Sequence, residues 1–146
     1  MELHSSSFDG GGTISARYGK RAENVSPQLS WSDVPAGTRS LALAMVDLHP
    51  IARGYVHWVV TGLAPEVSSL AEGAAAAGMP AGSRELVPYA GPFPPSGTHE
   101  YEFTLYALDR EPEVPAGATL VRFLDAAEGH ILATARLSGN FTRESE

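Results

Sequence analysis

Short apolar runs bounded by glycine and proline dominate this chain, and that pattern favours β-strands over helices. Residues 40–47 form one such run, which follows the turn-forming residues 35–37 and ends before Pro50. Residues 55–61 are β-branched or aromatic almost throughout, which is the strongest strand signal in the sequence. Because both runs are too apolar to leave one face in water, we expect two strands in the middle of a sheet that is covered on both sides.

A third strand is predicted for residues 99–109, where apolar and polar positions alternate at first. Side chains of a strand alternate between two faces, so His99 and Tyr101 are expected to project from the same face. Beyond residue 117 the spacing becomes helical, with apolar residues at Leu120, Phe123, Leu124, Ala127 and Ile131. The spacing does not decide whether residues 131–138 continue this helix or form a strand.

The segment between the second and third strands, residues 62–98, is rich in glycine and proline and is predicted to be a long connection. Four successive alanines, residues 74–77, could form one helical turn, which the flanking glycine and proline residues confine. Long connections inside a compact domain are uncommon and tend to carry function. The segment therefore indicates a site nearby.

Length and composition fit one mainly β domain that spans residues 1–146. A chain of 146 residues can build one hydrophobic core, and 43% of its residues are hydrophobic. Its 15 glycines and 11 prolines are too many for a helix bundle but suit an all-β fold with many turns. The sequence contains no internal repeat and no interdomain linker.

Charge and residue usage exclude several classes of function. The net charge is −7 and no basic run is present, so the chain is not expected to bind nucleic acid. The absence of cysteine excludes disulfides, thiolate chemistry and cysteine-based zinc sites. The N-terminus lacks the features of a signal peptide, and no stretch is long and apolar enough to span a bilayer. We therefore expect a cytoplasmic protein without integral membrane contact.

Four polar residues stand where the strand pattern calls for apolar ones: Asp47, His57, His99 and Tyr101. Each has a structural explanation, such as a core histidine bonded to a carbonyl or an aspartate in a turn before proline. Together they have the chemistry of a small anion pocket. Imidazole N–H and phenol O–H groups donate to phosphate oxygens, and a nearby carboxylate orients an imidazole and raises its pKa.

Several blocks of the sequence, in order, resemble the phosphatidylethanolamine-binding protein family, and especially its bacterial and archaeal branch, which is similar to Raf kinase inhibitor protein. Residues 24–31 are similar to the family block N-x-S-P-x-L-x-W, and residues 35–40 to the turn P-x-G-T-x-S. The three later blocks are H-W-V-V at residues 57–60, Y-x-G-P-x-P-P-x-G-x-H at residues 89–99 and G-H-x-L-A at residues 129–133.

This resemblance implies a fold and a site. The fold is a β-sandwich of two antiparallel sheets with one or two peripheral helices, and the pocket lies at one end of the sandwich. Family pockets accept phosphate-type and carboxylate anions, including the phosphoethanolamine head group. The positions that match the family's ligand contacts are Asp47, His57, His99 and Tyr101, with Gly91 and Pro92 shaping the rim. Bacterial members of the family also suggest a homodimer.

The segment after Asp47 departs from the family pattern. Where the family has D-P-D-A-P, residues 47–50 are one residue shorter, lack the second carboxylate and include His49. One hypothesis is an anion-binding protein that regulates a partner protein. The alternative is a small-molecule enzyme whose remodelled pocket transfers protons through Asp47, His49, His57, His99 and Tyr101. Imidazole and carboxylate also suit a divalent metal, but no metal-ligand spacing is present, and no metal or other cofactor is expected.

Overall fold

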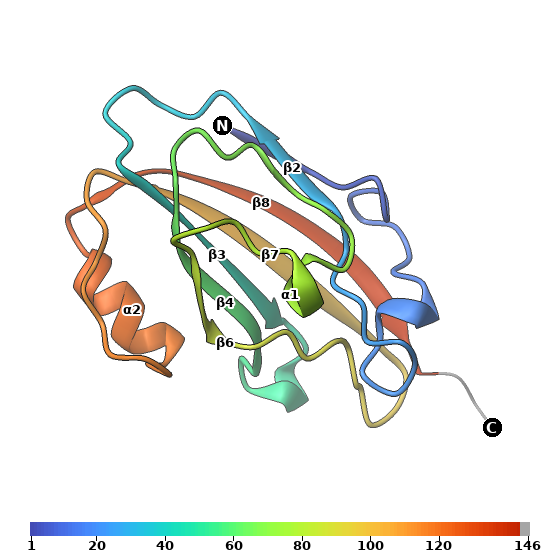
Figure 1. Ribbon diagram of the computed structural model, residues 1–146. Helices are drawn as coiled ribbons and strands as arrows, with labels where there is room; N and C mark the ends of the chain where they lie inside the picture. Colours follow the sequence, from blue (N-terminus) through green and yellow to red (C-terminus); the bar gives the residue numbers. More distant parts are fainter. Residues whose placement is uncertain (144–146) are drawn as a thin grey trace.

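The computed structural model describes residues 1–143, without the side chain of Ala77, so residues 144–146 of the predicted domain lie outside it. Two antiparallel sheets face each other, a small one of strand order β1-β2-β5 and a large one of order β6-β4-β3-β7-β8 (Figure 1). The strands are β1 Glu2–His4, β2 Leu29–Ser32, β3 Ser40–Asp47, β4 Val56–Leu63, β5 Ser69–Leu70, β6 Arg84–Val87, β7 Thr98–Leu108 and β8 Ile131–Thr142. The helices are α1 Ala74–Ala77 and α2 Leu120–Ala127, with 3₁₀ turns η1 Ala16–Tyr18 and η2 Pro50–Ala52. This architecture confirms the predicted β-sandwich with peripheral helices.

The two strands predicted from apolar runs, β3 and β4, both lie inside the large sheet, as expected. β3 pairs with β7 over its whole length, from Ser40 opposite Leu108 to Asp47 opposite Tyr101. Because β3 is antiparallel to both neighbours, its C-terminal end lies beside the starts of β4 and β7. This end of the large sheet is where the predicted polar residues gather.

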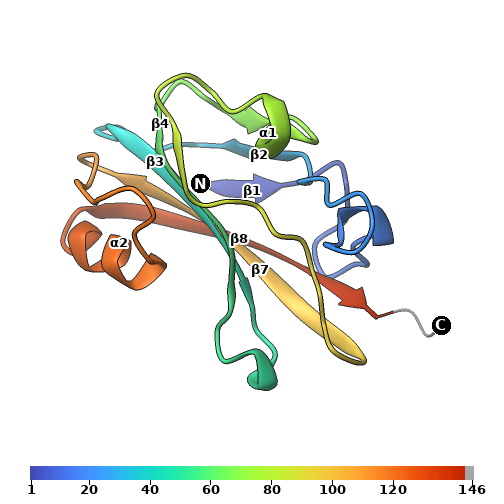
Figure 2. The same ribbon diagram turned by 60° about the horizontal axis from the view of Figure 1, so that its bottom comes forward.

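Successive side chains of β3 enter two separate cores, as the alternation of a strand requires. Leu43 and Met45 pack between the two sheets. Ala42 and Ala44 face the other side, in one cluster with Phe123 of α2. This helix lies against the outer face of the large sheet (Figure 2). Burial on both faces explains why this strand is apolar at consecutive positions and does not alternate with polar residues.

The connection between β4 and β7 contains more regular structure than the sequence indicated. α1 forms at the four alanines, β5 joins the small sheet, and β6 pairs with β4 at the edge of the large sheet. The sequence pattern missed β6 because a four-residue strand that includes Arg84 and Glu85 has neither an apolar run nor a clear alternation. An edge strand tolerates such polar side chains, which also discourage pairing with other chains.

The segment that the spacing left open, residues 131–138, is a strand. The hydroxyl of Thr119 begins α2 by accepting the backbone N–H of Arg122 at 3.1 Å. Gly129, at a φ of 81°, follows the helix and turns the chain back towards the sheet. β8 then pairs with β7 along its length, so the alternating interpretation of this segment was the right one.

Candidate ligand pocket

A cavity of about 360 Å³ opens at the end of the large sheet where β3 stops and where β4 and β7 start. Its polar residues come from three strands: Asp47 ends β3, His57 is the second residue of β4, and His99 is the second residue of β7. The antiparallel pairing brings these distant positions together. The lining residues are Lys20, Asp47, Ile51, Ala52, Tyr55, His57, Ala90, Gly91, Phe93, Pro95 and His99.

His57 points towards this cavity because β4 is irregular at its start. Trp58 lies opposite Met45, whereas Val56 lies opposite the next residue of β3. His57 is therefore an extra residue without a partner on β3, as in a β-bulge, and a bulge re-aims a side chain. Its ring centroid lies 5.1 Å from that of Tyr101, so His57 shares a face with the polar residues of β7.

Asp47 and His99 form a buried polar pair. The Nδ1 atom of His99 lies 2.6 Å from Oδ2 of Asp47, and the two side chains are 2% and 5% exposed respectively. A carboxylate oxygen accepts, so Nδ1 of His99 carries the proton and Nε2 is left for a ligand. The other oxygen of Asp47 accepts the backbone N–H of His49 at 2.8 Å. Each oxygen of Asp47 thus accepts one hydrogen bond within the protein, and the contact with Nδ1 orients His99.

His49, which distinguishes the segment after β3, lies beside His99 and does not line the cavity. The two rings stack, with 3.9 Å between centroids and 8° between planes. Nδ1 of His49 accepts the backbone N–H of Ile51 at 3.2 Å and so caps η2. The third imidazole predicted from the sequence is therefore adjacent to the site, where it supports the His99 ring.

His57 is held by the backbone of Ala90. Its Nδ1 donates to the Ala90 carbonyl at 2.6 Å, and the Ala90 N–H donates to the His57 carbonyl at 2.9 Å. Burial lowers the pKa of the imidazole, and this effect outweighs the opposing influence of the Ala90 carbonyl and of the Asp47 charge. Asp47 thus acts in the direction that the sequence predicted, but the net shift is downwards, and His57 is neutral at neutral pH.

Tyr101 lies opposite Asp47 in the sheet and is fully buried, so it does not line the cavity itself. Its ring is 6.4 Å from that of His99 and packs edge-on against His57. Within residues 1–143, its hydroxyl has no hydrogen-bond partner. Burial first, and then the charge of Asp47, raise the pKa of this phenol, so it keeps its proton. An unpartnered buried donor beside a cavity indicates a place where a ligand could bind.

Gly91 closes the wall opposite the strands. Its N–H donates to Oδ1 of Asn24 at 2.8 Å, which ties the wall to the segment before β2. A Cβ atom at this position would stand 2.0 Å from the carbonyl oxygen of Tyr18, so a larger residue would push the wall away. The same carbonyl accepts the hydroxyl of Tyr89 at 2.8 Å. The family-like blocks at residues 24–31 and 89–99 therefore meet at this wall.

The structure differs from the sequence interpretation at the rim. Gly91 lines the cavity, whereas Pro92 lies in the wall of a second, smaller cavity. Lys20 lines the pocket although sequence reasoning did not select it. Its backbone N–H donates to the Pro92 carbonyl at 3.1 Å, and its ammonium lies 5.8 Å from the centre of the Phe93 ring. The pattern of apolar and polar residues does not identify Lys20 as a pocket residue, because its place depends on contacts between segments that are far apart in the sequence.

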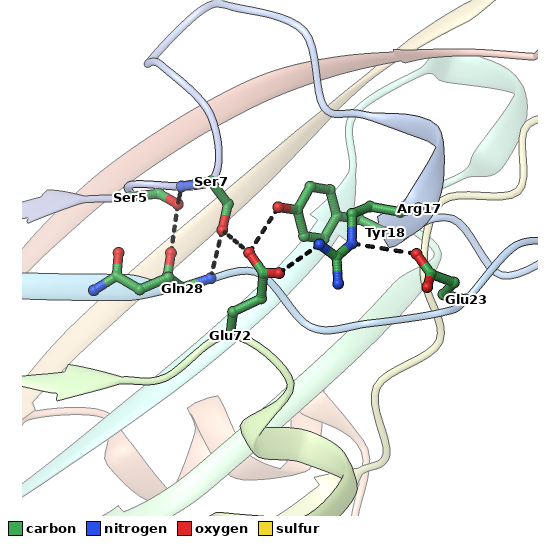
Figure 3. Close-up of polar contacts among 7 residues, drawn as sticks. All are labelled: Ser5, Ser7, Arg17, Tyr18, Glu23, Gln28 and Glu72. Atoms are coloured by element: carbon green, nitrogen blue, oxygen red, sulfur yellow. Dashed lines mark hydrogen bonds and ion pairs between the residues drawn. The ribbon is translucent and has the colours of Figure 1, made fainter.

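The loop that carries Lys20 is fixed by a polar network around Glu72, which Figure 3 shows. Glu72 accepts the hydroxyl of Tyr18 at 2.8 Å and that of Ser7 at 3.0 Å, and it forms an ion pair with Arg17 at 3.0 Å. The Tyr18 hydrogen bond is the main reason why the pKa of the Glu72 carboxyl is lowered. The residues drawn are Ser5, Ser7, Arg17, Tyr18, Glu23, Gln28 and Glu72. This network positions the pocket wall from outside, because Tyr18 also contacts Gly91.

Two further observations apply to the part of the chain that the structure describes. No three His, Cys, Asp or Glu side chains there are placed to hold one metal ion together. None of its helices has the length and apolar character needed to cross a membrane.

Residues 4–142 match the family described as phosphatidylethanolamine-binding protein. The chain belongs to this family. It is 39% identical over 150 residues to a UPF0098 protein of the archaeon Methanothermobacter thermautotrophicus, with 98% of this chain and 99% of that protein covered. It is also 39% identical over 152 residues to a UPF0098 protein of Chlamydia muridarum, covering 99% of this chain and 100% of the relative. The family predicted from the motif blocks is thus confirmed.

Solved structures agree with this assignment. A phosphatidylethanolamine-binding protein homologue of Chlamydia trachomatis is 35% identical, with a TM-score of 0.86 over 98% of this chain and 97% of its own. YbcL of Escherichia coli, a member of the same family, has a TM-score of 0.88 at 24% identity over 98% of each chain, and this likeness shows the fold alone. The paired sheets described above are therefore the fold of the family.

Proposed function

We propose that the pocket binds a small anionic group: a phosphate, a phosphoethanolamine head group or a carboxylate. The observation that carries the proposal is the convergence of donors on a cavity whose carboxylate already accepts hydrogen bonds from His99 and His49. Both oxygens of Asp47 accept hydrogen bonds within the protein, whereas Nε2 of His99 and the ammonium of Lys20 remain for a ligand, and the unpartnered hydroxyl of Tyr101 lies buried behind the cavity wall. Hydrogen bonds to an anion are stronger than neutral ones, and partial exclusion of water strengthens them further.

The protonation of His57 adds a preference among anions. Because Nδ1 of the neutral ring donates to Ala90, Nε2 presents a lone pair to the cavity. A phosphate monoanion carries a hydroxyl that can donate to this lone pair, whereas a carboxylate requires His57 to take up a proton. In both cases the complex contains one more proton, carried either by the phosphate or by His57. We therefore expect anion binding to tighten as the pH falls from about 8 to about 6, around the second pKa of a phosphate monoester.

The role in the cell is part of the same proposal. The mouth of the pocket is surrounded by Ile51, Tyr55 and Phe93, which are between 42% and 65% exposed. An apolar rim around an anion site suits contact with a partner protein that responds to the bound ligand. We propose a cytoplasmic binding protein that regulates such a partner, and a homodimer as its form in solution.

Titration with phosphate and with phosphoethanolamine, followed by NMR, tests the pocket directly. The ring signals of His57, His99 and Tyr101 should shift together and saturate with one dissociation constant. His4 and His130 are not among the residues that line the cavity, so they serve as internal controls in the same spectra. Signals of the pocket rings that do not move at saturating ligand, or that move no more than those of the two controls, would refute the anion site.

Two charge variants distinguish anion binding in the pocket from attraction by the overall charge of the protein. Lys20→Met should weaken phosphate binding about fivefold, since a single partly solvated cation contributes roughly 1 kcal/mol. Arg110→Met removes an exposed charge beyond the far end of β7 and should leave the affinity unchanged. Equal weakening by both variants would mean that net charge alone attracts the anion.

A second candidate function, proton transfer on a small substrate, is favoured by the 2.6 Å contact of Asp47 with His99. Such a pair fixes the ring and leaves Nε2 of His99 as a base. The activated ester 4-nitrophenyl acetate offers a simple probe, because base-assisted hydrolysis releases a coloured phenol. Hydrolysis that is saturable and lost in both His99→Gln and His49→Ala would support the enzyme. A rate equal to that of free imidazole would leave the binding protein as the better proposal.

A further inference from the structure

A second cavity, of about 250 Å³, shares Phe93 with the first as a lining residue. It is formed by η1 and the loop that follows it, by the proline-rich segment before β7, and by the C-terminal end of β8 with the residue after it. Gly19 lets these parts approach, because a Cβ there would stand 2.6 Å from the ring of Phe141. The lining residues are Ala16, Gly19, Arg21, Ala22, Pro92, Phe93, Pro94, Phe141 and Arg143.

The charged residues in this lining are both arginines, Arg21 and Arg143, and the other residues are apolar or glycine. The guanidinium of Arg21 lies 4.3 Å from the centre of the Phe93 ring, which fixes its position by a cation–π contact. Neither arginine forms an ion pair with a residue in the range 1–143, whereas the nearby Arg17 forms two. Two cations thus share an apolar hollow in a protein whose net charge is −7.

We infer that this second cavity is a binding site for an organic anion, separate from the pocket of the proposed function. Its carboxylate or phosphate would lie between Arg21 and Arg143, since a guanidinium pairs with either group through two parallel hydrogen bonds. Its apolar body would cover Pro92, Pro94 and Phe141. The site therefore selects an anion that carries an aromatic or aliphatic group, and inorganic phosphate alone leaves the apolar wall uncovered.

The test is an NMR titration of the whole chain with four probes: phenyl phosphate, phenylacetate, inorganic phosphate and benzyl alcohol. Both aromatic anions should shift the signals of Gly19, Ala22 and Phe141 and bind at least about tenfold more tightly than benzyl alcohol, which lacks the charge. A preference for phenyl phosphate or phenylacetate identifies which anion the site takes. Inorganic phosphate should shift these three residues less than phenyl phosphate does.

Matched charge variants test the two arginines. The double variant Arg21→Met and Arg143→Met keeps apolar stems and should weaken both aromatic anions at least about tenfold. Arg122→Met removes an exposed charge from α2 and should have no effect. Equal weakening by Arg122→Met, or benzyl alcohol that binds as well as the anions, would overturn the proposal. Glu144 and Glu146 follow Arg143 in the sequence, and weaker binding after both are changed to Gln would also contradict it.

The two sites can fail independently. His57 and His99 report on the first pocket, and Gly19 and Phe141 report on the second. Shifts confined to the two histidines with every probe would reject the second site and keep the first. Shifts confined to Gly19 and Phe141 would reject the first and keep the second.

Discussion

The two ends of β7 carry the same chemical pair in different surroundings. At the pocket end, Asp47 and Nδ1 of His99 are 2.6 Å apart, and their side chains are no more than 5% exposed. Just beyond the other end, Asp109 and Nδ1 of His130 are 2.8 Å apart, with 43% and 34% exposed. The residue types and the contact are alike, but the first pair is buried and its aspartate also accepts the backbone N–H of His49. An aspartate–histidine pair is therefore a surface feature in one place and part of a candidate site in the other.

Burial changes what the pair does to its neighbours. At the exposed end, water solvates both groups, so the contact has little influence beyond itself. At the pocket end, burial requires partners for Asp47, which accepts hydrogen bonds from His99 and His49, and its charge reaches His57 and the unpartnered phenol of Tyr101. Polar groups that lie buried, although burial costs free energy, indicate a functional site more strongly than the mere presence of an aspartate–histidine pair does.

The largest expected effect comes from removing each aspartate in turn. Asp47→Ala leaves a buried imidazole and the backbone N–H of His49 without partners, so it should lower the free energy of unfolding by about 3 kcal/mol. Asp109→Ala exposes the His130 ring to water and should cost less than about 1 kcal/mol. Urea unfolding with unchanged m-values measures both costs. Similar losses in the two variants would show that burial does not distinguish the pairs.

A smaller difference in stability is expected between variants of two buried tyrosines near the pocket. The hydroxyl of Tyr89 donates to the Tyr18 carbonyl, so Tyr89→Phe should cost about 1 kcal/mol of stability. Tyr101→Phe removes no hydrogen bond to a residue in the range 1–143 and should change stability by less than about 0.5 kcal/mol. The same variant should weaken phosphate binding about fivefold, because one donor to the anion is lost.

Urea unfolding and an NMR titration of both tyrosine variants supply the two readouts. If Tyr101→Phe destabilises the protein as much as Tyr89→Phe, or binds phosphate like the unchanged chain, then the Tyr101 hydroxyl has a structural role and not a ligand-binding one.

Much of the fold was predictable from local features of the sequence. β3 was found because an apolar run ends shortly before Pro50, and its polar last residue, Asp47, marked the end of the sheet. His57 was found because it interrupts an apolar strand. The bulge that turns it towards the cavity has no sequence signature, since a bulge depends on pairing with a strand that is distant in the sequence.

The parts that sequence reasoning missed depend on contacts between distant segments. Lys20 reaches the pocket through contacts such as the bond of its backbone N–H to the Pro92 carbonyl, which joins segments far apart in the sequence. Phe93 forms a wall of both cavities, and nothing in its surrounding prolines indicates which way its ring points. β6 was missed because an edge strand of four residues does not need an apolar run. Local patterns identify the residues of the strands, whereas the loops that complete the pocket require the folded structure.

The smallest expected effect concerns pH, and it again compares the two ends of β7. Burial lowers the pKa of His57 below its ordinary value of 6.5, so below pH 6.5 the unfolded chain binds a proton that the folded chain resists. This contribution to stability is present above pH 6.5 and is lost as the pH falls through the lowered pKa. In His57→Asn, where an amide N–H can replace the donor to Ala90, urea unfolding should show a smaller loss of stability between pH 7 and pH 5 than in the unchanged chain. His130→Asn keeps His57 and should retain the full loss. An undiminished loss in His57→Asn would show that burial at the pocket end does not hold this imidazole neutral.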